Sequence, residues 1–144
     1  NSTFDRVFSF CVIEHIPEYE DIFRECLRIL RPGGELAISV DSLTGVPEEL
    51  LAKHREEHKV VRYFKHDDLK ELLVSTGFED VRVKPLYAGR AAAKLFCEGI
   101  EREFSYSLAE SLRDWLRLGL SAMANRRKKE GVFLAATATK GSSA

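Results

Sequence analysis

The sequence predicts an α/β fold in which two parallel strands are joined by a crossover helix. The main indication is a strand, helix and strand pattern between Phe4 and Val40, with a Pro-Gly-Gly turn at 32–34 before the second strand. Two more strand-like segments follow further along the chain. With 144 residues, 44% of them hydrophobic, the chain has the size of a single domain and enough apolar material for a core.

The first strand, helix and turn follow from local chemistry. Residues 4–10 form a short, mostly apolar run, as expected of a strand buried on both faces. A helix is predicted from Pro17, with an apolar face made of Ile22, Phe23, Cys26, Leu27 and Leu30. Pro32 cannot continue this helix, and Gly33 can take the positive φ of a type II turn. Residues 36–40 then form a second buried strand.

The later segments predict one helix and two strands of different kinds. Asp67 and Asp68 open a helix that Gly77 should end in a left-handed conformation. Residues 78–86 alternate between apolar and polar side chains, which predicts an edge strand with one face exposed to solvent. Residues 132–136 are continuously apolar, so we expect a central strand that is covered on both sides.

A helical insertion is predicted at 88–130, before the last strand. Ser107 and Glu110 have the spacing of a capping box at the start of its second helix. That helix carries an apolar stripe of Leu108, Leu112, Trp115, Leu116, Leu120 and Met123. The stripe either packs the helix onto its neighbours or covers a substrate pocket. The basic run at 126–129 is interpreted as a solvated helix end, with contact to phosphate or an anionic surface as the alternative.

Several segments, in this order, resemble one known family. They are Phe4-Asp5-Arg6-Val7, then Val12-Ile13-Glu14-His15-Ile16, then 28–34 and 36–40. The sequence resembles the C-terminal half of a class I S-adenosylmethionine-dependent methyltransferase of the small-molecule type. The resemblance implies a Rossmann-like sheet with local strand order 4-5-7-6, an antiparallel last strand, and 88–130 as a cap within a single partial domain.

The resemblance also implies a function and a set of site residues. The expected reaction is methyl transfer from S-adenosylmethionine to an unidentified small-molecule acceptor, with the cofactor at the carboxyl ends of the strands. The residues expected to contact the cofactor are Ser9, Phe10, Cys11 and Ile16. Those expected near the acceptor are Glu14, Asp41, Ser42, Phe96 and Trp115, with Phe104 and Tyr106 as further aromatic candidates. His15 could act as a general base, since its ordinary pKa is about 6.5, or it could only cap or orient the helix start.

One part of the family pattern is missing from this sequence. No Gly-x-Gly-x-Gly segment is present, and the chain begins at Asn1 rather than Met. We therefore expect a fragment that by itself neither binds the cofactor tightly nor catalyses methyl transfer. Its first strand should expose an edge at which two copies could meet as a homodimer. The alternative function is a non-catalytic, methyltransferase-like module for interaction or dimerisation.

Composition and motifs weigh against other classes. The formal net charge of −1 does not favour nucleic acid or an anionic membrane, and no apolar run is long enough for a bilayer. Cys11, Cys26 and Cys97 lack paired spacing, which suits free thiols in the cytoplasm. His54, Glu57 and His58 match a zinc-protease spacing, but their charged neighbours predict a solvated helix, so no metal site is expected.

Overall fold

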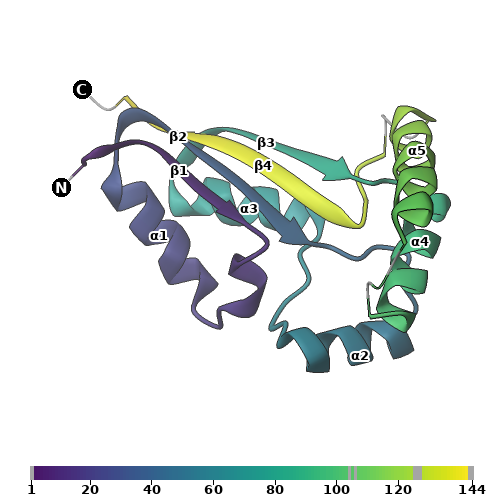
Figure 1. Cartoon of the computed structure of the whole chain (residues 1–144). Coiled ribbons are helices and arrows are strands. Elements are labelled where there is room, and N and C mark those ends of the chain that lie inside the picture. The colour runs from purple at the N-terminus through teal and green to yellow at the C-terminus, as the bar shows by residue number, and fades with distance from the viewer. Residues whose placement is uncertain (1, 104, 106, 125–127, 143–144) are drawn as a thin grey trace.

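The computed structural model describes residues 2–103, 105, 107–124 and 128–142, and gives the backbone alone at positions 108, 109, 122 and 124. Its strands are β1 (Phe4–Phe10), β2 (Leu30–Asp41), β3 (Phe78–Leu86) and β4 (Phe133–Lys140), which form one sheet in the order β1-β2-β4-β3 (Figure 1). β1 and β2 are parallel, whereas β4 runs antiparallel to both β2 and β3. The predicted α/β fold, strand order and strand directions are confirmed.

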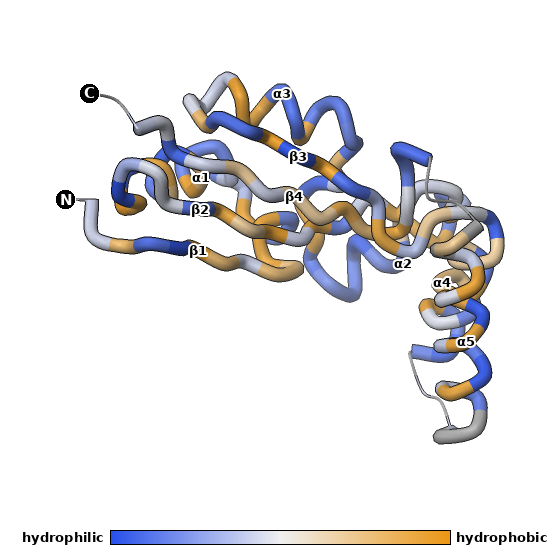
Figure 2. The backbone as a smooth tube through the Cα atoms, turned by 90° about the horizontal axis from the view of Figure 1, so that it is seen from above, coloured by the Kyte–Doolittle hydropathy of each residue, from blue (hydrophilic) through white to orange (hydrophobic). Residues whose placement is uncertain are grey.

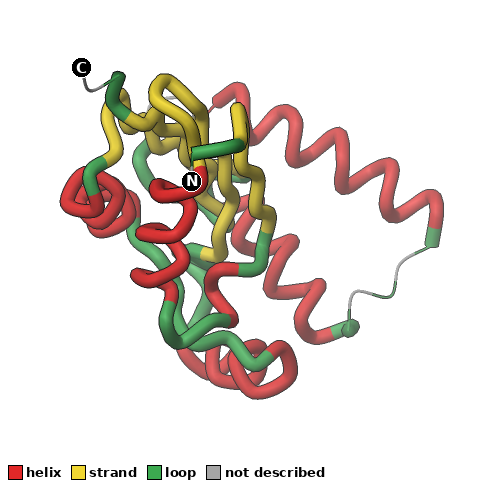
Figure 3. The backbone as a smooth tube through the Cα atoms, turned by 90° about the vertical axis from the view of Figure 1, so that its left-hand side faces the viewer, coloured by secondary structure: helices red, strands yellow, loops and turns green. Residues whose placement is uncertain are grey.

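Helices cover one face of this sheet and extend beyond one end of it. They are η1 (Ile13–His15), α1 (Tyr19–Ile29), α2 (Glu48–His58), α3 (His66–Thr76), α4 (Arg90–Glu101) and α5 (Leu108–Ala124). α1 and α3 lie on the same face, and α4 and α5 stand at the end of the sheet away from the termini (Figures 1 and 3). No helix in the described part of the chain is both long and apolar enough to cross a bilayer.

The core lies between the sheet and the layer of α1 and α3. Phe23 of α1 and Leu69 and Leu73 of α3 are fully buried against Leu36 and Leu134 of the central strands. Burying each such side chain contributes about 1.5 to 3 kcal/mol, so this layer provides much of the stability. A smaller cluster holds the α4 region to the loop after β2, and it contains Leu43, Val46, Ala92, Ile100 and Val132. Figure 2 shows the apolar character of the central strands β2 and β4.

The turn between α1 and the main part of β2 depends on glycine. Gly33 has φ 75°, as predicted. At Gly34, an added Cβ would lie 2.9 Å from the backbone oxygen of Arg31 and 3.1 Å from that of Asp5. The chain thus turns tightly against the start of β1. Gly77, with φ 109°, ends α3 in the predicted left-handed conformation.

The burial predicted for β1 is wrong. Phe4, Phe8 and Phe10 are 53% to 62% exposed, because β1 is an edge strand and no described helix covers the sheet face opposite α1 and α3. β4 is central as predicted, and Val132, Leu134 and Ala136 are buried, whereas Phe133 and Ala135 on the other face are partly exposed. The first helix begins at Tyr19 rather than Pro17, and Leu30 already belongs to β2.

Of the two interpretations of the apolar stripe of α5, packing onto its neighbours is wrong. Leu112, Trp115, Leu116, Leu120 and Met123 are 54% to 69% exposed, and the side chain of Leu108 lies outside the described residues. α5 instead contacts its surroundings through other positions. Leu118 packs on the smaller cluster, and the hydroxyl of Ser121 donates to the backbone oxygen of Ala88 at 2.8 Å.

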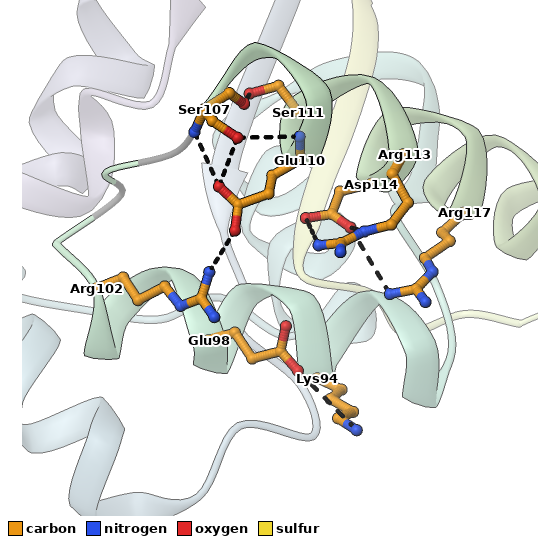
Figure 4. Close-up of polar contacts among 9 residues, drawn as sticks. All are labelled: Lys94, Glu98, Arg102, Ser107, Glu110, Ser111, Arg113, Asp114 and Arg117. Atoms are coloured by element: carbon orange, nitrogen blue, oxygen red, sulfur yellow. Dashed lines mark hydrogen bonds and ion pairs between the residues drawn. The ribbon is translucent and has the colours of Figure 1, made fainter.

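The predicted capping box at the start of α5 is confirmed (Figure 4). The backbone N–H of Ser107 donates to Glu110 Oε2 at 3.0 Å, and the N–H of Glu110 donates to Ser107 Oγ at 3.4 Å. Arg102, directly after α4, also donates to Glu110 at 3.1 Å, which joins the end of α4 to the start of α5. Of the basic run at 126–129, the first two residues lie outside the described part. Lys129 lies 3.2 Å from Asp67, a surface pair of small energetic value.

Candidate functional site

The chain makes a sharp turn directly after β1. Cys11 has φ 49°, an unusual conformation for a residue with a side chain, and its backbone N–H donates to Ser39 in β2 at 3.0 Å. The short helix η1 follows at once. This turn carries the chain across the carboxyl end of β2, where the parallel strands β1 and β2 end side by side.

Glu14 in η1 is completely buried at this position. Its backbone oxygen accepts bonds from the N–H groups of Val61 and Arg62, at 2.8 and 3.2 Å. Its carboxylate Oε1 accepts a bond from the backbone N–H of Asp41 at 3.3 Å. The second carboxylate oxygen, Oε2, has no hydrogen-bond partner. Glu14 therefore connects three separate segments and keeps one buried oxygen unsatisfied.

Asp41 ends β2 beside Glu14 and is 5% exposed. Burial raises the pKa of its carboxyl group, and the nearby carboxylate of Glu14 raises it further, to about 7. A carboxyl group with this pKa can hold a proton near neutral pH. Asp41 is thus suited to accept or release a single proton.

The thiol of Cys11 completes the cluster. Its Sγ lies 3.4 Å from Ser39 Oγ, and burial is the main cause that raises the pKa of this thiol. Sγ and one carboxylate oxygen each of Glu14 and Asp41 all lie within 4.8 Å of one another. The structure therefore brings together three residues that were predicted for the site. We define them as the carboxyl-thiol cluster.

The other residues predicted around the cofactor lie on both sides of this cluster. Ser9 and Ile16 are half-buried, whereas the ring of Phe10 is exposed on the open sheet face. His15 is half-buried at the end of η1. The N-cap residues of η1 and α1, Val12 and Glu18, make no side-chain capping bond, and both roles considered for His15, general base and orientation of the helix start, stay predictions.

Ser42 follows Asp41 but faces a different set of partners. Its hydroxyl lies 3.0 Å from that of Thr44, which in turn donates to Glu130 at 2.8 Å. Its backbone N–H donates to Val132 at 3.0 Å. Ser42 therefore connects the end of β2 to the segment before β4.

An apolar pocket of about 350 Å³ lies between α4, α5 and the last strands. Phe96 and Trp115 both line it, so the structure brings together the two aromatic residues predicted near the acceptor. The ring of Phe96 packs against that of Phe133 at 5.6 Å. Phe104 and Tyr106 lie outside the described residues. No member of the carboxyl-thiol cluster lines this pocket.

His54 is buried, which corrects the prediction of a solvated helix around it. It is 5% exposed, and its Nδ1 lies 3.0 Å from the hydroxyl of Tyr63, which itself donates to the backbone oxygen of Leu51. Burial is the main cause that lowers the pKa of His54, to about 4, with the nearby His58 contributing. The rings of Tyr63 and Phe96 cover His54, and both residues lie outside its helix. The sequence pattern around His54 therefore did not indicate its burial.

Comparisons with known proteins agree with this fold. A family model described as a methyltransferase domain matches residues 1–38. The arsenite methyltransferase of Halobacterium salinarum is 36% identical over 87 residues, which are 55% of this chain and 21% of that protein. A similar solved structure is that of phosphoethanolamine N-methyltransferase 2 of Haemonchus contortus, in complex with phosphomonomethylethanolamine and S-adenosylhomocysteine. It matches with a TM-score of 0.63 and 22% identity, and the match covers 97% of this chain and 34% of that one. The resemblance to class I S-adenosylmethionine-dependent methyltransferases is confirmed.

The fold is compatible with more than one reaction. The [4+2]-cyclase SpnF matches this chain with a TM-score of 0.58 and 17% identity, over 99% of this chain and 52% of that one. The chain spans about a fifth of the length of its curated relative and about a third to a half of these structures. The function of the methyltransferase-like chain must therefore be argued from its own site.

Proposed function

We propose that this chain forms the acceptor side of an S-adenosylmethionine-dependent methyltransferase that acts on a small molecule. The observation that carries the proposal is the carboxyl-thiol cluster at the carboxyl ends of β1 and β2. Ligands of open α/β sheets bind at this edge. A small-molecule acceptor is also supported by the similar structure from Haemonchus contortus, because its complex contains a small phosphorylated amine and S-adenosylhomocysteine.

The residues present suit one end of the cofactor. S-adenosylmethionine supplies the methyl group as part of a sulfonium cation. The two buried carboxyl groups of Glu14 and Asp41 provide negative charge where such a cation would bind, and one oxygen of Glu14 is unsatisfied. Ser9, Phe10, Cys11 and Ile16 would surround that end. A glycine-rich loop for the rest of the cofactor does not occur in this sequence.

The chain would act mainly by positioning the acceptor. The pocket lined by Phe96 and Trp115 can hold an apolar part of it, and alignment with the methyl group can lower the barrier by about 7 to 11 kcal/mol in favourable cases. Asp41 and Glu14 can take one proton from the acceptor as it reacts. His15 is a second candidate base beside them, and Ser42 would bind on the acceptor side.

Methyl transfer by the protein that carries this chain tests the proposal. The purified protein is incubated with labelled S-adenosylmethionine and separate small acceptors, including arsenite and phosphoethanolamine. We expect incorporation with one class of acceptor, and a loss of about 100-fold or more with Asp41→Asn, the range seen when one acid–base group is removed. Glu56→Gln, at an exposed position on α2, is the matched control. Binding of S-adenosylhomocysteine without any transfer would favour the non-catalytic alternative.

That alternative is a module that dimerises through β1. The exposed rings of Phe4, Phe8 and Phe10 and the free edge of β1 support it, because such an edge is a template for a second chain. Sedimentation of the isolated chain should then show a homodimer. Phe8→Lys should dissociate it, whereas Leu120→Lys on α5 should not. A dilute, folded monomer would exclude this function. A cytoplasmic location suits either function, since Cys11, Cys26 and Cys97 are free thiols.

A further inference from the structure

The carboxyl-thiol cluster has the composition of a metal site as well as that of a proton site. It offers one sulfur and two carboxylate oxygens from Cys11, Glu14 and Asp41, all within 4.8 Å of one another. The three residues come from the end of β1, from η1 and from the end of β2, so the fold itself brings them together. It is the one such group in the part of the chain that the structure describes.

The unsatisfied oxygen of Glu14 is an independent sign that a ligand is missing. Oε2 is fully buried and has no hydrogen-bond donor, although Oε1 of the same group is bonded to the N–H of Asp41. Leaving a buried polar atom unpaired is unfavourable, and for a charged group the cost is larger. The other carboxyl group of the cluster, that of Asp41, is also buried, so a negative charge on both groups is still less favourable. A cation would remove both problems.

We propose that Cys11, Glu14 and Asp41 bind a divalent transition-metal ion of the Zn²⁺ class. This inference goes beyond the proposed methyl transfer and does not depend on it. A thiolate ligand disfavours Mg²⁺ and Ca²⁺, whereas Zn²⁺ accepts both sulfur and carboxylate oxygen.

Distances and charges fit this class of ion. In a tetrahedral site, ligand bonds of about 2.0 to 2.3 Å place donor atoms about 3.3 to 3.8 Å apart, so side chains of the cluster that are separated by up to 4.8 Å must move closer by about 1 Å to hold the ion. A divalent ion held by one thiolate and two carboxylates leaves a single excess negative charge, so the site would not repel a cationic ligand. Three protein ligands leave a fourth position open, and Cys11 is exposed, so this position can be reached from solvent.

Cobalt absorption tests the site without reference to activity. Co²⁺ is titrated into the metal-free chain, whose folding is checked by circular dichroism. We expect one equivalent to bind with a sulfur-to-metal charge-transfer band and with the visible bands of a tetrahedral site, and Zn²⁺ to displace it. Because losing an outer partner of a metal ligand already costs about 10- to 100-fold in affinity, Cys11→Ser should cost about 100-fold or more and abolish the sulfur band.

The chain provides matched controls. Cys26→Ser and Cys97→Ser, at the two other thiols, should keep the band and the affinity. Glu14→Gln and Asp41→Asn should weaken binding but keep the sulfur band. The proposal is overturned if the folded chain shows no sulfur band, if the band survives Cys11→Ser, or if both carboxyl variants bind Co²⁺ as tightly as the parent. Unchanged Co²⁺ affinity in both carboxyl variants would mean that the two buried carboxyl groups hold a proton rather than a metal ion. Cys11 is an exposed position, so its variant should fold even where a buried carboxyl variant does not.

Discussion

The carboxylate of Glu14 accepts a hydrogen bond at 3.3 Å from the backbone N–H of Asp41, 27 residues further along the chain. This bond joins the loop after β1 to the end of β2. It also fixes the distance between two buried carboxyl groups, so the same contact shapes both the local fold and the chemistry of the site.

Removing the Glu14 side chain should destabilise the protein. Glu14→Ala leaves the buried N–H of Asp41 without its acceptor, which should lower the free energy of unfolding by about 1 to 3 kcal/mol. Urea denaturation at pH 7.5 measures the change. Glu56→Ala, on the exposed side of α2, should stay within about 0.5 kcal/mol of the parent. Equal stability of the two variants would contradict the role given to Glu14.

Burial of His54 should make stability depend on pH. The pKa of His54 is lowered from 6.5 to about 4 in the folded state, so the unfolded chain binds this proton more strongly. The contribution of His54 to stability should therefore fall as the pH drops below about 6.5 and level off below about 4, by at most about 3 kcal/mol, whereas the raised pKa of Asp41 contributes in the opposite direction over the same range. Urea denaturation between pH 7.5 and 4.5 measures this. His54→Gln should remove this contribution and change the profile by up to that amount, whereas His66→Gln should not; identical profiles for the parent and His54→Gln would refute this prediction.

Two glycines should respond in opposite ways to alanine. Gly34→Ala places a Cβ 2.9 Å from a backbone oxygen, so we expect a loss of about 1 to 3 kcal/mol in the free energy of unfolding. Gly119→Ala, inside α5, meets nothing within 4 Å and should gain about 0.5 to 1 kcal/mol from helix propensity. Thermal unfolding of both variants compares them directly. A neutral Gly34→Ala would show that the turn relaxes easily.

The fluorescence of Trp115 should report the exposure of α5. Trp115 is the only tryptophan of the chain and is 69% exposed. Acrylamide should quench it almost as well in the folded protein as in urea. Strong protection in the folded monomer would show that the stripe is covered. A ligand that enters the neighbouring apolar pocket should reduce the quenching, and Phe96→Ala should weaken that response.

The isolated chain should not bind the cofactor tightly. The carboxyl-thiol cluster suits only the methyl-donor end of S-adenosylmethionine, and no glycine-rich loop is present for the rest. Calorimetry of this chain with S-adenosylhomocysteine should therefore show no binding in the micromolar range. Micromolar affinity would mean that residues within this chain form a complete site.

Local patterns predicted the sheet well because each strand and turn has its own signal. The turn at Gly33 and the cap at Gly77 are properties of the backbone, and both were correct. The exposure of Phe8 and Trp115 was not predictable, because periodicity shows which face is apolar but not what covers it. The burial of His54 depends on residues distant in sequence, which no pattern around it contains.

The position of the site in the fold could be predicted from the sequence better than the chemistry of its side chains. Cys11 was expected at the cofactor and Asp41 near the acceptor, and both do lie where neighbouring parallel strands end at the same edge of the sheet. The complete burial of Glu14, and the oxygen it leaves unpaired, depend on how η1 folds over β2. A charged residue in a loop is normally solvated, so nothing in the sequence pointed to this burial.

β4 is the last strand in the chain, yet it lies between β2 and β3. During synthesis, neither neighbour can complete its backbone pairing until residues 133–140 have left the ribosome. Nearly the whole chain must therefore emerge before the sheet closes, and most pairings join residues that are far apart in sequence. Formation of this sheet should accordingly be slow, and nascent chains that stop before Phe133 should be substrates for chaperones rather than folded intermediates.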